Sequence, residues 1–312
     1  MRSDSSIAGS VSPMSDATSS PAGLRRQTLG LWLGALGVLI FALTLPMTRL
    51  AVGPASDPQL PPLFVTAGRA GLAGLLSIAY LVLTGAPRPS GPQWRSLVIT
   101  ASGVVIGFPL FLALALRHVG AMHAAVVTGL LPLGTAAVGA VVLRQRASFG
   151  FWACAVAGSL LVLAFAWQAG GGLQIADGLL LLSVLAGSVG YVWGARLSSQ
   201  MSAEQVICWV LVLSLPLTLP LMLWAWPSQP VRASAWGGFA YVTLFSMWIG
   251  FFAWYRGLAL GGTLRVSQVQ LIQPFLALLF AVPVLGEVIE GTTLMYSLAV
   301  IGTVFVSKRM KV

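Results

Sequence analysis

Charged side chains are scarce in this sequence of 312 residues: they form 8% of it, and only seven residues are Asp or Glu. A soluble globular domain carries about 25% charged residues, so the composition excludes that class. None of the acidic residues lies in the middle of an apolar run. The sequence therefore offers no acid deep in a membrane helix that could carry a proton.

Catalytic and metal-binding patterns are missing as well. Cys154 and Cys208 both lie in apolar runs, where we expect small buried hydrophobic residues rather than a disulfide or a metal pair. The apolar runs contain neither the two aspartates of an intramembrane aspartyl protease nor a serine with a positioned base. We therefore expect no enzyme, no cofactor and no bound metal.

Apolar residues dominate instead, at 57% of the chain, and the mean hydropathy is +0.91. An α-helix needs about 20 such residues to cross a bilayer. Ten runs of this kind lie at 29–48, 61–83, 95–116, 121–143, 148–167, 176–197, 205–226, 235–256, 266–285 and 290–307. The sequence predicts an all-α polytopic membrane protein with ten transmembrane helices.

The net charge of +10 and the pI of about 10.8 would suggest nucleic acid in a soluble chain, but the basic residues lie in loops and tails. Thirteen of them fall on the side of both termini, against Arg49, Arg117 and Arg232 on the other side. Because basic residues mark cytoplasmic loops, we expect cytoplasmic termini and the inner membrane. Residues 1–28, which show no periodicity, are expected to form a disordered cytoplasmic tail. The expected partners are the lipid bilayer and a small-molecule substrate, with no nucleic acid and the oligomeric state open.

The chain also contains signs of an internal repeat. A shift of 142 residues aligns Gly120 with Gly262 and Pro132 with Pro274. Since an odd number of crossings reverses orientation, a five-helix repeat would insert the second half upside down. Two inverted five-helix repeats are therefore predicted at 29–167 and 176–307. Inverted repeats are typical of transporters.

The run at 266–285 contains polar side chains that need partners inside a membrane. The amides of Gln270 and Gln273 must face protein or a wet cavity, and they can donate to a carboxylate and accept from an amine. Pro274 withholds one backbone donor and allows a bend. Pro46 and Pro132 have the same property, so these three prolines are candidate hinges.

The run at 235–256 carries four aromatic residues on one helical face, namely Trp248, Phe251, Phe252 and Tyr255. Two interpretations remain open: the face forms a wall of an aromatic cavity, or it contacts lipid and core with Tyr255 in the interfacial belt. Trp248 and Phe252 are the deeper pair. We take them as the candidates for substrate contact.

Two hydroxyls and one arginine complete the set. Thr44 precedes Pro46, and a shift of 147 residues sets Tyr191 opposite Thr44, so both are candidate substrate contacts. Ser and Thr hydroxyls, however, often bond back to their own helix. Arg69 lies inside 61–83, where it is either a functional charge or a structural arginine bonded to carbonyls. The predicted substrate-binding residues are Thr44, Tyr191, Trp248, Phe252, Gln270 and Gln273.

Several motifs occur once in each half: Gly120-Ala121, Leu131-Pro132-Leu133 and Gly158, then Gly262, Gln273-Pro274-Phe275, Gly286-Glu287 and Gly302. With them the chain after residue 28 resembles EamA-type members of the drug/metabolite transporter superfamily. The resemblance implies ten helices in two inverted halves and a central cavity lined by helices one, three, four, six, eight and nine. It also implies export of amino acids or other small metabolites. Arg144-Gln145 departs from the family's Gly-Glu, so no proton-coupling role is carried over.

We therefore expect a secondary transporter that exports small metabolites, amino acids among them, across the inner membrane by alternating access. One alternative is a drug or organic-cation exporter, which would depend on contacts between the cation and aromatic rings. A second alternative is a non-transporting membrane assembly or receptor protein. The sequence does not name the solute, the driving force or the direction of net flux.

Overall fold

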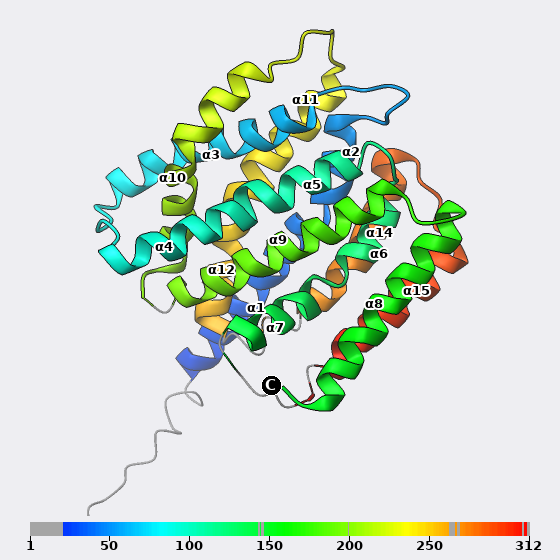
Figure 1. The fold of residues 1–312 in the computed structure, drawn as a ribbon. Coiled ribbons are helices and arrows are strands. Elements are labelled where there is room, and N and C mark those ends of the chain that lie inside the picture. Colours follow the sequence, from blue (N-terminus) through cyan, green and yellow to red (C-terminus); the bar gives the residue numbers. More distant parts are fainter. Residues whose placement is uncertain are drawn as a thin grey trace, which may run out of the picture.

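The computed structural model describes residues 21–142, 144, 147–198, 200–261, 266, 269–307 and 309–310. These residues form helices and loops, and they contain no strand, so the expected all-α fold is confirmed (Figure 1). The first 20 residues of the expected tail, Gln145 of the first-half position Arg144-Gln145, and Gly262, which the repeat aligns with Gly120, lie outside this part of the chain.

Eight helical segments are long and apolar enough to cross a membrane. They are Leu24–Val52, Pro62–Leu83, Gly91–Ala115, Ala121–Val142, Phe149–Ala169, Ile175–Ser198, Glu204–Trp224 and Ala233–Gly261. Two shorter apolar segments follow at Val269–Leu285 and Gly291–Ser307. The sequence located all ten segments. That the last two also cross the membrane, which would make ten crossings, stays a prediction.

Five of the segments are single helices: α3 (Pro62–Leu83), α8 (Phe149–Gly170), α9 (Ile175–Ser198), α10 (Ala203–Trp224) and α15 (Gly291–Ser307). The others are divided. The first consists of α1 (Pro21–Ala42) and α2 (Thr44–Val52), and the third of α4 (Gly91–Thr100), η1 (Ala101–Gly107) and α5 (Phe108–Ala115). The fourth consists of α6 (Ala121–Thr128) and α7 (Leu131–Val142), and the eighth of α11 (Ala233–Tyr241), η2 (Val242–Ile249) and α12 (Gly250–Gly261). The ninth consists of η3 (Val269–Ile272) and α14 (Gln273–Leu285).

Helix α1 begins at Pro21 and so overlaps the end of the tail expected at 1–28. Proline suits the first position of a helix because the N–H that it lacks would have no partner there. The residues that follow, Ala22, Leu24, Arg25 and Arg26, have high helix propensity. The helix therefore begins eight residues before the apolar run expected at 29–48.

Each candidate hinge proline lies in the first turn after a helix interruption. Pro46 is the third residue of α2, Pro132 the second of α7 and Pro274 the second of α14. Since proline cannot donate to the carbonyl four residues earlier, the backbone ladder breaks there. The structure thus places an interruption at all three prolines, while movement about them stays a prediction.

Two further segments contain π-helix, which the sequence analysis did not anticipate. These are η1 in the third segment and η2 in the eighth. Insertions of this kind inside α-helices occur frequently at functional sites. They alter which side chains face a neighbour, because the spacing of 3.6 residues per turn no longer holds.

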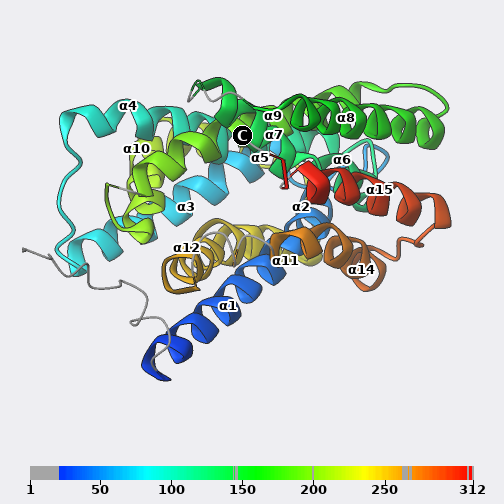
Figure 2. The same ribbon diagram turned by 90° about the horizontal axis from the view of Figure 1, so that it is seen from below.

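Helices of the two predicted repeats pack against each other in pairs: α1 with α12, α3 with α10, α5 with α9, α6 with α14 and α8 with α15. Figure 1 shows α8 and α15 side by side along one edge. In Figure 2, α1, α12 and α14 lie in one layer, and α8 and α9 lie in the layer opposite. The two halves are therefore interleaved rather than separate domains.

Glycines allow the closest of these approaches. A Cβ added at Gly257 of α12 would lie 2.6 Å from the backbone nitrogen of Gly34 in α1. A Cβ added at Gly103 of η1 would lie 2.5 Å from the carbonyl oxygen of Ala186 in α9. Both distances are below any ordinary contact, so these helix pairs require glycine.

Candidate substrate cavity

A central cavity lies among the divided segments and includes about 830 Å³ of unfilled space, part of it open to solvent. The resemblance predicted a lining from helices one, three, four, six, eight and nine, and residues of all six are present, with Arg69 added from helix two. The lining residues are Phe41, Thr44, Leu45, Arg69, Val104, Phe108, Pro109, Leu112, Thr128, Gly129, Leu131, Pro132, Tyr191, Ser246, Met247, Phe251, Gln270, Gln273, Pro274 and Ala277.

A second cavity, which includes about 950 Å³ of unfilled space, part of it open to solvent, adjoins the first and shares Phe41, Tyr191, Phe251 and Gln270 with it. It extends along the last turns of α9 and α12, as far as Ser198 and Ala259 among others. The shared residues place the two cavities next to each other. The second cavity lies toward the end of the molecule at which α9 and α12 finish.

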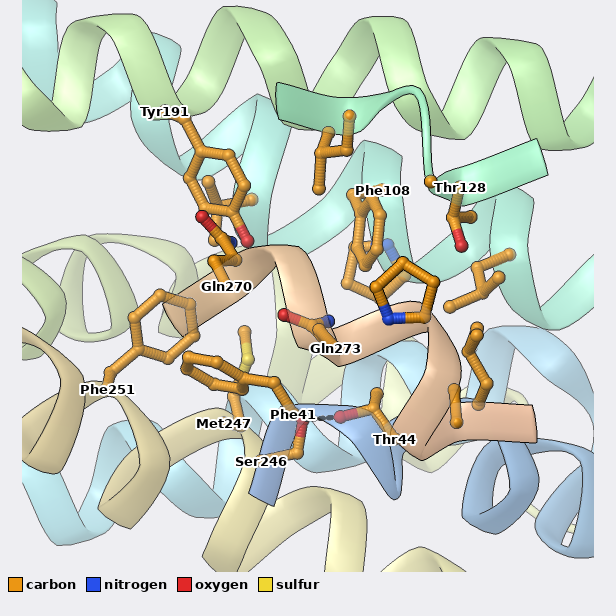
Figure 3. Close-up of a pocket in the computed structure, with 18 of the residues that line it drawn as sticks. Phe41, Thr44, Phe108, Thr128, Tyr191, Ser246, Met247, Phe251, Gln270 and Gln273 are labelled. Carbon is orange, nitrogen blue, oxygen red and sulfur yellow. Dashed lines mark hydrogen bonds between the residues drawn. The ribbon is translucent and has the colours of Figure 1, made fainter. Parts of the chain in front are cut away.

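Three polar side chains form a network in the cavity wall. Thr44 Oγ1 and Ser246 Oγ are 2.8 Å apart, and Arg69 Nη2 donates to Ser246 Oγ at 3.1 Å. Figure 3 shows the bond between Thr44 and Ser246. Arg69 is 4% exposed, and its Nε has no partner among the described residues. The guanidinium is therefore only partly satisfied, and the hydrogen bond found for it goes to a hydroxyl rather than to a carbonyl.

Gln270 and Gln273 extend from the ninth segment into the same space. Figure 3 shows them between Tyr191 and Phe108 on one side and Phe41 and Met247 on the other. The side-chain oxygen of Gln273 is buried and has no hydrogen-bond donor within the described part of the chain. A buried acceptor without a donor costs free energy, and a bound molecule that donates to it would remove this cost.

Of the predicted site residues, the cavity contains Thr44, Tyr191, Gln270 and Gln273, together with Pro132, Pro274 and Arg69. Pro46 is buried beside the cavity, one residue beyond the lining residue Leu45.

The two predicted contacts from the eighth segment, Trp248 and Phe252, are not brought to this cavity. Trp248 Nε1 donates to Ser77 Oγ at 3.2 Å, and the Phe252 ring packs 4.9 Å from that of Tyr80, both on α3. Phe251 occupies the cavity wall instead, with its ring 5.1 Å from that of Phe41. The reason is geometric. Phe251 follows Trp248 by three residues and Phe252 follows it by four, so the two phenylalanines lie on opposite flanks of the aromatic face. Only the flank with Phe251 reaches the cavity.

Sequence reasoning also missed much of the lining, including Phe41, Phe108, Ser246 and Met247. Ser246 left a signal, because it is a polar residue inside an apolar run. Phe41 shares a helical face with Thr44, three residues later. Met247 and Phe108 carry no such signal, since each is an apolar residue among apolar residues.

The opposite end of the molecule, with loops 53–61, 116–120, 171–174, 225–232 and 286–290, is held together by polar contacts. We call it the clamped end. Glu287, from the loop after α14, accepts hydrogen bonds from the backbone nitrogens of Ala121 at 2.7 Å and Met122 at 2.8 Å. Its carboxylate caps the N-terminus of α6, where unpaired N–H groups and the helix dipole favour a negative charge.

Further contacts join the predicted halves at the clamped end. His123 Nε2 lies 2.7 Å from Asp177 Oδ1, and Arg232 forms an ion pair with Asp57. Within the first half, Arg117 Nη2 donates to the Leu60 carbonyl at 3.2 Å, and desolvation lowers the pKa of Arg117 from its ordinary value. A packed core that includes Leu60 and Leu116 lies beneath these bonds. Both polar and apolar contacts therefore hold the helices together at the clamped end.

The profile of the EamA-like transporter family matches residues 28–168 and again residues 174–308. A protein of Bacillus subtilis (strain 168), named "Uncharacterized transporter YdeK", is 44% identical over 289 residues, which cover 92% of this chain and 99% of the relative. A protein of known crystal structure superposes with a TM-score of 0.61 at 19% identity, covering 90% of this chain and 97% of the other. At that identity the superposition shows a shared fold alone.

Proposed function

The chain belongs to the EamA-like transporter family, and on this premise we propose that it exports small, partly apolar metabolites, amino acids among them, by alternating access. Membership makes the protein a multi-pass membrane transporter rather than an enzyme, as the sequence predicted. A lipid bilayer and a small-molecule substrate are the partners that such a protein has. Export, substrate class and mechanism belong to the proposal.

The observation that carries the proposal is a central cavity with different surroundings at its two ends: a second cavity adjoins it on one side, and polar and apolar contacts join the helices at the clamped end. Hydrogen bonds that backbone N–H groups of α6 donate to Glu287, together with the packed core, hold the clamped end, while the second cavity lies beside the first along α9 and α12. Alternating access requires one such state and a second with the opposite end closed. The interrupted helices around the cavity supply positions at which the backbone can bend.

Three observations support two inverted repeats at 29–167 and 176–307. The family profile matches twice, with bounds near these. The third and eighth segments both contain a π-helix. The pairing of the first segment with the eighth is mirrored by that of the third with the sixth, as a two-fold axis relating the halves would produce.

The proposed substrate follows from the cavity wall. Amides of Gln270 and Gln273 can both donate and accept hydrogen bonds, and the Phe41 and Phe251 rings supply apolar contact. The proposed orientation, with both termini in the cytoplasm of a cell with an inner membrane, follows from the basic loops. In that orientation the clamped end faces outward.

The drug or organic-cation alternative is less favoured. Within the described part of the chain, no Asp or Glu lines either cavity, whereas the cation Arg69 does. A cationic drug would meet a like charge without any acid to balance it. The other alternative, a non-transporting assembly or receptor protein, gives no role to a central cavity lined by Arg69 and Gln273, each of which has a buried polar atom without a partner among the described residues.

Counterflow in proteoliposomes tests the proposal. Vesicles that contain the purified protein and an excess of one unlabelled amino acid should accumulate the labelled form, with saturation. Gln273→Leu should abolish recognition of the polar end of the solute while the protein still reaches normal levels. Absence of saturable counterflow across a panel of amino acids and drug-like cations would leave the non-transporting alternative.

A further inference from the structure

Arg69 places a positive charge in the wall of the central cavity, and it has no acidic partner among the residues that the structure describes. It is 4% exposed, and the described residues that line the two cavities include no Asp, Glu or His. The two ion pairs found among the described residues join other side chains. A buried charge without a counter-ion is strongly unfavourable, so the site is incomplete as it stands.

Packing of α3 explains why Arg69 faces this cavity. A Cβ added at Gly68 would lie 2.9 Å from the Phe239 ring, and one added at Gly71 would lie 3.1 Å from Leu219 Cδ2, so that face of α3 is already filled. Arg69 lies about 100° further round the helix from Gly68. There its Nη2 donates to Ser246 Oγ. This neutral hydroxyl holds the guanidinium in place but leaves its charge unbalanced.

We propose that Arg69 binds a carboxylate of the transported solute, so that the substrates are small carboxylates with an apolar body. The proposal rests on the proposed function, because it names the substrate class of the same cavity. The unpartnered Nε belongs to a planar array of donors that matches the two oxygens of a carboxylate. One cation balances one negative charge, which favours a monocarboxylate over a phosphate dianion.

The remaining wall fits the rest of such a solute. The unpartnered oxygen of Gln273 accepts from a hydrogen-bond donor, as an amino or hydroxyl group beside the carboxylate would provide. The side chains of Phe41, Met247 and Phe251 pack against an apolar body. An α-amino acid or an α-hydroxy acid satisfies both requirements.

The thermal stability of the purified full-length protein tests the proposal, because a ligand that binds the folded state raises Tm. The probes are two matched series at constant pH and ionic strength. The first contains leucine, 2-hydroxy-4-methylpentanoate, 4-methylpentanoate and leucine amide. The second contains phenylalanine, 2-hydroxy-3-phenylpropanoate, 3-phenylpropanoate and phenylalanine amide. We expect the carboxylates of at least one series to raise Tm and both amides to have no effect. Inorganic phosphate at the same concentration should also have no effect. Equal shifts with amide and acid, a shift with phosphate alone, or no shift at all would overturn the proposal.

Variants locate the response. Arg69→Gln should raise the carboxylate concentration needed for a given Tm shift by about tenfold or more, since it removes a charged donor. Arg69→Lys should retain part of the response. Arg117→Gln, which removes an arginine at the clamped end, should leave the carboxylate concentration needed for that Tm shift unchanged. An unchanged response in a folded Arg69→Gln protein would overturn the proposal.

A measurement on the unmodified protein covers the case in which Arg69 variants do not fold. Phenylglyoxal modifies arginine side chains, and peptide mass spectrometry reports each site separately. The carboxylate that raises Tm should slow modification of Arg69 but not of Arg117, and the matched amide should protect neither. Failure to protect Arg69 would overturn the proposal.

The outcomes also separate this inference from the proposed function. Saturable counterflow with no difference between acid and amide would reject Arg69 as the carboxylate site and leave the transporter proposal intact. Carboxylate binding that protects Arg69, without counterflow, would reject the transport proposal and leave the binding site intact.

Discussion

Phe251 and Phe252 are neighbours in the sequence with the same side chain, yet they lie in different surroundings. Phe251 lines both cavities and contacts Phe41, whereas Phe252 packs against Tyr80 and Trp248. We expect Phe251→Ala to weaken apparent affinity for the solute by about 1 to 3 kcal/mol, because an apolar contact is lost. The concentration dependence of counterflow measures this change.

Phe252→Ala is the matched control for that experiment, since it removes the same side chain from the same helix. It should lower thermal stability but leave the apparent affinity unchanged. Trp248→Ala should behave in the same way, because its indole is bonded to Ser77 outside the cavity. If Phe252→Ala weakened affinity as much as Phe251→Ala did, our assignment of the two flanks would be wrong.

At the level of elements, the interrupted helices are the feature that proline chemistry predicts best. Pro274 lies between η3 and α14, and Pro132 occupies the matching position at the start of α7. Replacing either by Ala restores a backbone donor and favours a straight helix, which we expect to slow transport by about two- to tenfold. Initial rates of counterflow at equal protein levels check this expectation.

Pro283→Ala provides a control within the same helix as Pro274. Pro283 lies near the end of α14, is exposed, and does not line the cavities. Its replacement should leave the rate unchanged. Normal rates in both Pro132→Ala and Pro274→Ala would reduce these prolines to residues that shape helices without serving as hinges.

Glu287 joins two elements that are far apart in the sequence, the loop after α14 and the N-terminus of α6. We expect Glu287→Gln to weaken closure of the clamped end, because the charge that complements the helix N-terminus is lost. The open population should increase about twofold to fivefold. A cysteine at Thr128, in a background with Cys154→Ala and Cys208→Ala, should then react faster with a membrane-impermeant maleimide added to whole cells.

Glu290→Gln is the control for this measurement. Glu290 lies in the same loop and accepts from Thr292 Oγ1 at 3.4 Å, a contact within its own loop and helix. It should not alter the labelling rate. An unchanged rate in Glu287→Gln as well would show that the carboxylate does not hold the clamped end closed.

For the whole molecule, the test of orientation is the position of the loops. A reporter fused after Val312 should be active only in the cytoplasm, and one inserted at Gly171, between α8 and α9, should report from the outside. The expectation rests on thirteen basic residues against three on the two sides. Activity of the Gly171 insertion in the cytoplasm would contradict both the orientation and the outward position of the clamped end.

The sequence by itself determined the helical segments, their approximate bounds and the interruptions at Pro46, Pro132 and Pro274. These properties are local: a membrane span needs a continuous apolar run, and a proline removes a donor wherever it stands. Gln270 and Gln273 could be placed in a cavity for the same reason, since an amide in an apolar run has few other places to go.

Only the tertiary structure decided which flank of the aromatic face meets the cavity, that Arg69 lies in its wall, and that Glu287 caps α6. Phe251 and Phe252 have identical side chains, and packing of Phe252 against Tyr80 of α3 separates them. The partners of Arg69 and Glu287 lie 177 and 166 residues away in the chain. Contacts between such distant residues depend on how whole helices pack, and no local pattern in the sequence encodes that arrangement.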